Sequence, residues 1–143
     1  MAHLFKSKLS LRISGDSLVP AEINLLLGAS PTFSHAKGED IRGNKNGREL
    51  IARSGMWLLS VDDRSPENLD GQLRELFDQL TDNIDVWRKI DEDYSADLFC
   101  GLFMQGSNEG LTISASVMKM IADRRLEIGF DLYDGDGTSD NRG

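Results

Sequence analysis

The sequence predicts an α+β domain in which a mostly antiparallel or mixed sheet packs against about three helices as a two-layer sandwich. Segments of alternating apolar and polar residues predict strands, and segments with apolar residues three or four apart predict helices. Their order, β-α-β-α-β-β-α-β, favours an α+β arrangement. We expect one domain over residues 1–133 and an acidic, flexible tail over 134–143, because a chain of 143 residues is long enough for one core.

The first elements are a strand and a short helix. From Phe5 to Ile13 apolar residues alternate with basic or polar ones, which is typical of a strand with one buried face. Residues 16–28 contain Pro20 near the expected first helical turn, then apolar residues at helical spacing, and finally a glycine. They therefore predict a helix of two to three turns. Residues 31–40, PTFSHAKGED, indicate a turn, and residues 41–54 indicate a mobile polar loop.

The central elements are a buried strand and one long helix. GMWLLSV, residues 55–61, is short, apolar and rich in β-formers, so it predicts a strand. Ser65 and Pro66 then mark a helix start, and apolar residues three or four apart predict a helix over about 66–91. Its polar face is acidic and consists of Glu67, Asp70, Glu75, Asp78, Asp82 and Asp85.

Three further elements follow. ADLFCGLFM, residues 96–104, is apolar on both faces, which predicts a strand in the middle of the sheet. The break QGSNEG followed by LTIS suggests a hairpin. A helix is expected from Ser114 or Ser116 to about Arg125, and EIGFDLYD, which starts at Glu127, predicts the last strand.

Composition excludes several classes of protein and site. No apolar run reaches the roughly 20 residues that a membrane-spanning helix needs, and the first residues alternate unlike a signal peptide, so we expect a cytoplasmic protein. The single Cys100 lies among apolar residues and is expected to be a buried thiol. The two histidines, His3 and His35, and the absence of HExxH, CxxC, GxSxG and P-loop motifs predict no metal, no cofactor and no catalytic set. An enzyme is therefore less expected than a binding protein.

The charge distribution indicates the kind of partner. The net charge is −8, and residues 62–97 alone hold 12 acidic and 4 basic side chains. An acidic surface repels nucleic acid and anionic membranes but attracts a basic protein. The leading hypothesis is a non-enzymatic module that binds a basic protein through the acidic helix face, with an inhibitor or immunity role against a basic toxin domain as its concrete form. Both a monomer and a homodimer paired through an edge strand remain open.

A second hypothesis concerns the polar stretch 31–40 and Trp57. A small-molecule or anion-binding domain, possibly an enzyme, would use a pocket near residues 32–57. Backbone amides, a lysine and a hydroxyl are groups that receive a carboxylate or phosphate. The pocket would be formed by Thr32, His35, Lys37 and Trp57. The same stretch is also explained as a structural turn that leads into the loop.

The order of several short segments resembles a known family. These segments are LSLRISGDSLVPAEINLLLG, then Pro31-Thr32 and Lys37-Gly38, then GMWLLS, ADLFCGLF and LEIGFDLYD. Together they make residues 9–133 similar to a bacterial family called domain of unknown function 4279. The resemblance implies a compact α+β domain in bacteria, and it implies no activity.

Overall fold

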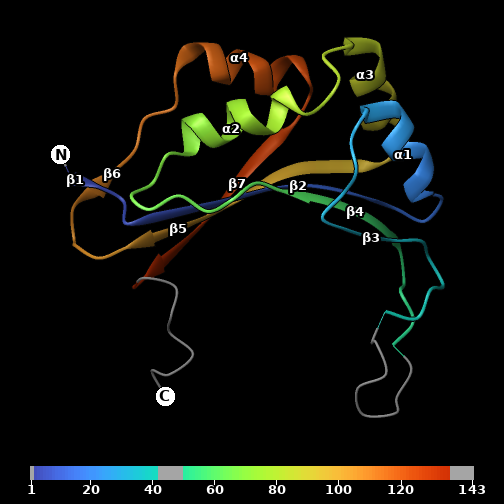
Figure 1. The fold of residues 1–143 in the computed structure, drawn as a ribbon, viewed down its shortest axis with the longest axis horizontal. Helices are drawn as coiled ribbons and strands as arrows, with labels where there is room; N and C mark the ends of the chain where they lie inside the picture. Colours follow the sequence, from blue (N-terminus) through green and yellow to red (C-terminus); the bar gives the residue numbers. More distant parts are fainter. Residues whose placement is uncertain (1, 42–49, 136–143) are drawn as a thin grey trace.

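The structure is a computed structural model that describes residues 2–41 and 50–135. It has the expected α+β architecture: a mixed five-stranded sheet carries the helices on one of its faces (Figure 1). Four helices are present in the described residues, and not three as predicted. Most of the predicted tail, and most of the predicted loop after residue 41, lie outside the described residues.

The sheet has the strand order β3-β4-β2-β5-β7. Neighbouring strands are antiparallel except for β5 and β7, which run parallel. Its strands are β3 (Phe33–His35), β4 (Gly55–Ser60), β2 (Lys6–Gly15), β5 (Ser95–Met104) and β7 (Glu127–Asp134). The sequence predicted four of them. β3 was assigned to a turn, because three residues are too few to show an alternating pattern.

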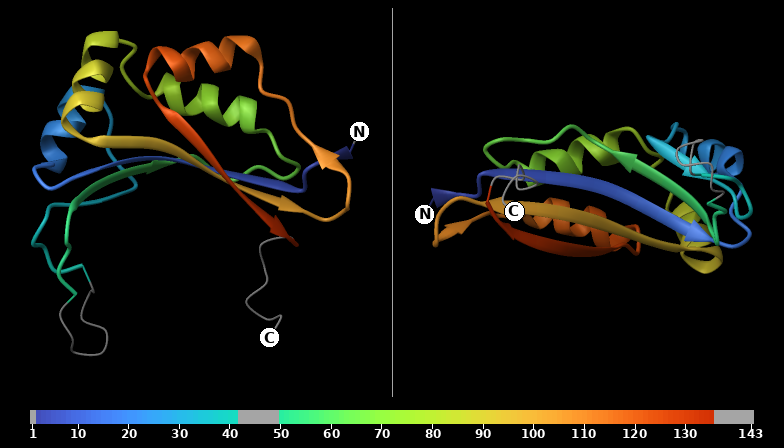
Figure 2. Two further views of the ribbon diagram at one scale, coloured as in Figure 1. Left: turned by 180° about the vertical axis from the view of Figure 1, so that it is seen from behind. Right: turned by 90° about the horizontal axis from the view of Figure 1, so that it is seen from below.

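The core lies between the sheet and the helices. In the central strands, Leu11 is aligned with Leu59 of β4 and with Leu98 of β5, and all three side chains are buried. Because side chains alternate across a strand, their neighbours emerge on the other face of the sheet. That face is the one without helices (Figure 2). The helix-facing core residues of these strands are Leu9, Leu11, Ile13, Trp57, Leu59, Leu98, Cys100 and Leu102.

Local signals define the ends of the helices. α1 (Pro20–Leu27) starts with proline and ends at Gly28, whose φ of 74° is a left-handed conformation that glycine adopts without strain. α4 (Ala115–Asp123) is capped by Ser114, whose hydroxyl accepts a hydrogen bond from the Val117 N–H. No helix among the described residues has both the length and the apolar character required to span a membrane.

The single helix predicted over 66–91 is wrong, because the chain forms α2 (Leu69–Asp78) and α3 (Ile84–Asp93) instead. Between them, the Thr81 hydroxyl accepts from the Asn83 N–H, and the Asn83 side chain accepts from the Asp85 N–H. Such local bonds from side chain to backbone compete with helical ones and start a new helix. The apolar spacing hid this break, because Leu80 is buried in the connection itself.

The predicted hairpin after β5 is also wrong. The short strand β6 (Glu109–Gly110) pairs in parallel with β1 (Ala2–His3) in a separate two-stranded sheet. β5 cannot accept a hairpin partner, because β2 and β7 already occupy both of its edges.

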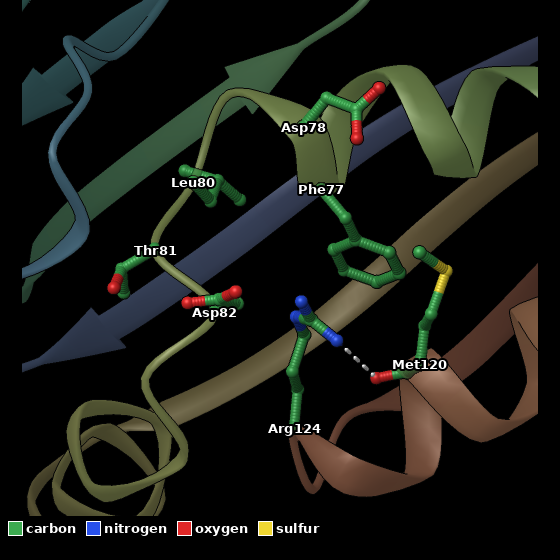
Figure 3. A pocket seen from close by; sticks show the side chains of 7 residues that line it. All are labelled: Phe77, Asp78, Leu80, Thr81, Asp82, Met120 and Arg124. Carbon is green, nitrogen blue, oxygen red and sulfur yellow. Dashed lines mark hydrogen bonds between the residues drawn. The ribbon is translucent and has the colours of Figure 1, made fainter.

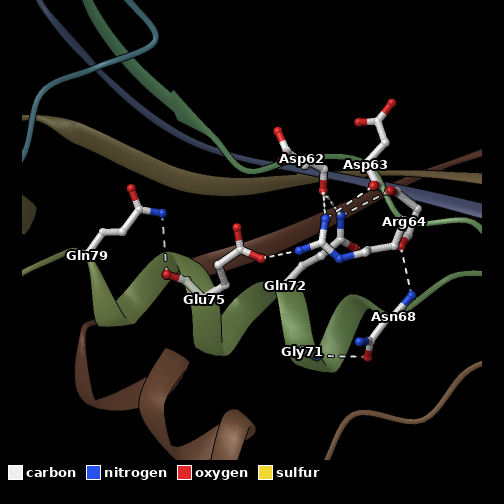
Figure 4. A network of polar contacts seen from close by, with 9 residues as sticks. Asp62, Asp63, Arg64, Asn68, Gly71, Gln72, Glu75 and Gln79 are labelled. Carbon is white, nitrogen blue, oxygen red and sulfur yellow. Dashed lines mark hydrogen bonds and ion pairs between the residues drawn. The ribbon is translucent and has the colours of Figure 1, made fainter.

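A buried polar network attaches α2 to β2 (Figure 4). The Gln72 side-chain amide donates to the carbonyl oxygens of Ser7 at 3.1 Å and Asp62 at 2.9 Å, and its oxygen accepts from the Ser7 hydroxyl. Ser7 and Gln72 are both fully buried. Nearby, Arg64 forms an ion pair with Glu75 of α2. The network satisfies polar groups that would otherwise be buried without partners.

Candidate functional site

The structure does not bring the four predicted pocket residues together. Trp57 is fully buried in the helix-facing core, and its indole N–H donates to the Asn24 side-chain oxygen at 2.8 Å. Its opposite neighbour in β3 is Ser34, so Phe33 and His35 emerge on the other face of the sheet. Trp57 therefore serves the core and does not form a pocket wall with His35.

The other predicted pocket residues have local partners. The Thr32 hydroxyl accepts from the Ser60 N–H at 2.9 Å, and the Lys37 ammonium lies 3.3 Å from the Asp16 carboxylate. The His35 ring contacts the Phe33 ring edge-on at 5.4 Å. Of these contacts, the hydrogen bond between Thr32 and Ser60 joins the start of the edge strand β3 to β4.

The predicted acidic helix face is divided by the break between α2 and α3, and most of its carboxylates have partners. Glu67 accepts from the Leu69 N–H, Asp70 accepts from the Ser114 N–H, and Glu75 and Asp85 pair with arginines. Within the described residues, two of the six form no hydrogen bond or ion pair. These two, Asp78 and Asp82, lie at the end of α2 and in the connection that follows.

Asp78 and Asp82 line a cavity of about 390 Å³ (Figure 3). The cavity lies between the end of α2, the α2–α3 connection and α4. Phe77, Thr81 and Met120 contribute to its walls, and the guanidinium of Arg124 points into it. We call this cavity, with Asp78, Asp82 and Arg124, the Arg124 cavity.

Arg124 is a buried cation. Its side chain is held by stacking, with the guanidinium carbon 4.6 Å from the centre of the Phe77 ring and 5.9 Å from that of Trp87. Burial lowers the pKa of Arg124, while the charges of Asp123 and Asp82 oppose this shift. The sequence pattern by itself does not mark Arg124 as a site residue, although Arg124 continues the helical spacing of Val117 and Ile121, a position where a charged residue is unusual.

The sheet face without helices carries a second set of polar and aromatic residues. The Arg12 guanidinium forms a two-point hydrogen bond with Asp97 at 2.8 and 2.7 Å, and this bond raises the pKa of Arg12. The Lys6 ammonium lies 4.7 Å from the centre of the Phe103 ring, which stacks on Tyr133 of β7. Charges on this face are largely neutralised by their neighbours.

The edge strand β7 is the most exposed part of the sheet. Within the described residues it pairs with β5 alone. On the side of the sheet that carries the helices, Phe130 is 43% and Leu132 64% exposed. Exposed apolar groups that are contiguous on a strand edge often mark a binding surface.

Cys100 is buried, as predicted, and burial raises the pKa of its thiol to about 12. We expect the native protein to resist thiol reagents at pH 8 and the urea-unfolded protein to react at once, as measured with Ellman's reagent. The unfolded thiol ionises near its ordinary pKa of 9.0, so the contribution of Cys100 to stability is lost as the pH rises from about 9 to about 12. Cys100→Ala is the control, because it should flatten this part of the stability curve; an unchanged curve contradicts the prediction.

The described residues contain no group of three or more histidine, cysteine or carboxylate side chains arranged to hold a metal ion. Among the described residues, the candidate sites are the Arg124 cavity, lined by Asp78 and Asp82, and the edge of β7 that faces away from β5.

Comparison with known proteins gives a family and no activity. No curated protein and no solved structure matches the chain. The model of a family described as a domain of unknown function (DUF4279) matches residues 5–135, which is nearly the whole chain. On this match, the chain belongs to the DUF4279 family.

Proposed function

We propose that this protein is a non-enzymatic binding module that recognises a basic, extended segment of a partner protein at the edge strand β7. The observation that carries the proposal is the edge of β7 that has no partner strand in the part of the chain that the structure describes, with its exposed Phe130 and Leu132. An inhibitor of a basic protein domain is the concrete form of such a function.

The backbone of β7 offers one half of the recognition. A strand at the edge of a sheet presents unpaired N–H and C=O groups, and an extended peptide binds there by forming the next ladder of hydrogen bonds. β7 is eight residues long and contains no proline that would remove a donor. A partner segment of similar length therefore has a complete strand to pair with.

The side chains of β7 offer the other half. Residues Phe130 and Leu132 alternate with Glu127 and Asp131, and the strand ends at Asp134 without any basic residue. Opposite charges on neighbouring strands stabilise a pair, as do apolar contacts on the same face. The complementary segment therefore has lysine or arginine alternating with apolar residues.

The same charges oppose the fully overlapping pairing of two copies of the chain. In that antiparallel register, Glu127 of one copy lies across from Asp134 of the other. Like charges in this position are destabilising. A register that pairs Phe130 with Phe130 avoids this contact, so a dimer through β7 is one outcome of the test below.

The test uses synthetic ten-residue peptides and ¹⁵N-labelled protein. A peptide in which lysine alternates with valine should shift the backbone amide signals of residues 127–134, because its N–H and C=O groups pair with β7. Asp131→Lys should weaken this binding roughly tenfold, since one cross-strand attraction becomes a repulsion.

Two controls make the result specific. Glu22→Lys reverses the charge of an exposed residue in α1, which lies against β4 and is separated from β7 by β2 and β5, so it should leave the affinity unchanged. A peptide of the same composition with its lysines grouped at one end should bind more weakly. The proposal is wrong if both peptides bind equally, if the shifts fall outside β7, or if the free protein is a dimer paired through β7.

A further inference from the structure

Arg124 has hydrogen-bonding capacity that the protein does not use. The residue is only 7% exposed, yet its guanidinium makes one hydrogen bond, from Nη1 to the Met120 carbonyl oxygen at 3.0 Å. The Nε–H is buried without an acceptor, and no carboxylate among the described residues forms an ion pair with Arg124. A buried cation in this state is costly, and most proteins provide it with an acceptor.

The position of the guanidinium is fixed before any ligand arrives. Phe77 from α2 and Trp87 from α3 stack on it, and the hydrogen bond to Met120 holds it from α4. Arginine presents its N–H groups as a planar fork that matches the two oxygens of a carboxylate. The stacked rings keep this fork in one orientation. The Arg124 side chain therefore loses little conformational freedom when a carboxylate binds to it.

The lining of the Arg124 cavity also contains two carboxylates. Asp78 and Asp82 form no hydrogen bond or ion pair within the described residues, although the charge of Asp82 opposes the lowering of the pKa of Arg124 by burial, and Thr81 adds a hydroxyl group. Two carboxylates and one guanidinium leave the cavity with an excess of negative charge. A simple anion such as phosphate is repelled by this excess, whereas a ligand that also carries a positive group is attracted.

We propose that the Arg124 cavity binds a small zwitterion, an amino carboxylate whose carboxylate group accepts hydrogen bonds from Arg124 while its ammonium group lies near Asp78 and Asp82. The cavity volume of about 390 Å³ is in the range of small-molecule sites. The site is separate from β7, since its lining residues come from α2, α4 and the connection after α2.

The test compares three probes with the same carbon chain: 5-aminopentanoate, pentanoate and pentylamine. Binding is measured by calorimetry and by the change in tryptophan fluorescence, to which Trp87, close to Arg124, contributes together with Trp57. We expect 5-aminopentanoate to bind at least roughly tenfold more tightly than either probe with a single charge, because only it uses both the guanidinium and the carboxylates.

Substitutions assign the two ends of the ligand. Asp82 is exposed, and Asp82→Asn removes one negative charge from the cavity. This substitution should weaken the binding of 5-aminopentanoate roughly tenfold and strengthen the binding of pentanoate. Asp85→Asn is the matched control in α3 and should change neither affinity. Arg124→Lys keeps the positive charge but loses the planar fork of N–H groups, so it should weaken the binding of both probes that carry a carboxylate. Circular dichroism checks that this variant is folded.

Three results would overturn the proposal. Pentanoate could bind the native protein as tightly as 5-aminopentanoate, which would remove the role of the two carboxylates. Asp82→Asn could change the affinities for both probes in the same direction. The third result is that none of the three probes shows binding at a concentration of about 10 mM, because even a weak specific site is occupied at that concentration.

Discussion

Replacing Trp57 with alanine should lower the free energy of unfolding by about 3–5 kcal/mol, the range for removing a large aromatic side chain from a core. Trp57 is fully buried between β4 and the helices. Its indole N–H also donates to Asn24 of α1, so the substitution leaves a cavity and removes a link between the sheet and a helix. Urea unfolding followed by circular dichroism measures the effect.

Two further substitutions separate the causes. Trp57→Phe keeps most of the ring volume but loses the N–H donor, so it should cost about 1–2 kcal/mol. Met56→Ala, at the next position and on the opposite face of β4, is half-buried and should cost about 1 kcal/mol. If Trp57→Ala costs no more than Met56→Ala, Trp57 is not a core residue and the pocket first expected from the sequence becomes tenable again.

Replacing Gln72 with alanine should lower the free energy of unfolding by about 2–4 kcal/mol, because several buried polar groups lose their partner at once. The Gln72 side chain bonds to the Ser7 hydroxyl, the Ser7 carbonyl oxygen and the Asp62 carbonyl oxygen. Ser7 is fully buried, so water does not replace the lost bonds without rearrangement. Thermal and urea unfolding both report this loss.

The matched control for this substitution lies two turns later in the same stretch of chain. Gln79 is exposed at the end of α2, and its side-chain amide reaches only the Glu75 carbonyl oxygen at 3.4 Å. Gln79→Ala should therefore change stability by less than about 0.5 kcal/mol. Equal effects of the two substitutions would show that the network around Gln72 contributes little.

The elements that the sequence predicted well are strands whose own residues alternate between apolar and polar or form a short apolar run. Alternation in residues 5–13 and 127–133 and the short apolar run at 55–61 correspond to β2, β7 and β4. The break between α2 and α3 was missed because the apolar spacing continues through Leu80, while the turn depends on Thr81 and Asn83. Apolar spacing alone cannot distinguish a continuous helix from two helices that bury the same side.

The candidate sites depend on contacts between distant parts of the chain. The acidic residues were visible in the sequence, but the hydrogen bond that Asp70 accepts from the Ser114 N–H requires α2 and α4 to be adjacent. In the same way, Arg124 is buried only because Phe77 and Trp87 come to it from two other helices. Sequence patterns describe one element at a time and do not contain this information.

The central place of β2 has a consequence for how the protein folds during its synthesis. β2 pairs with β4 and with β5, which both follow it in the chain, and β5 ends at Met104. The residues from β2 to the end of β5 must therefore leave the ribosome before the central strand has both of its neighbours. Pairing between segments so far apart in sequence slows folding and leaves apolar surface exposed in the meantime.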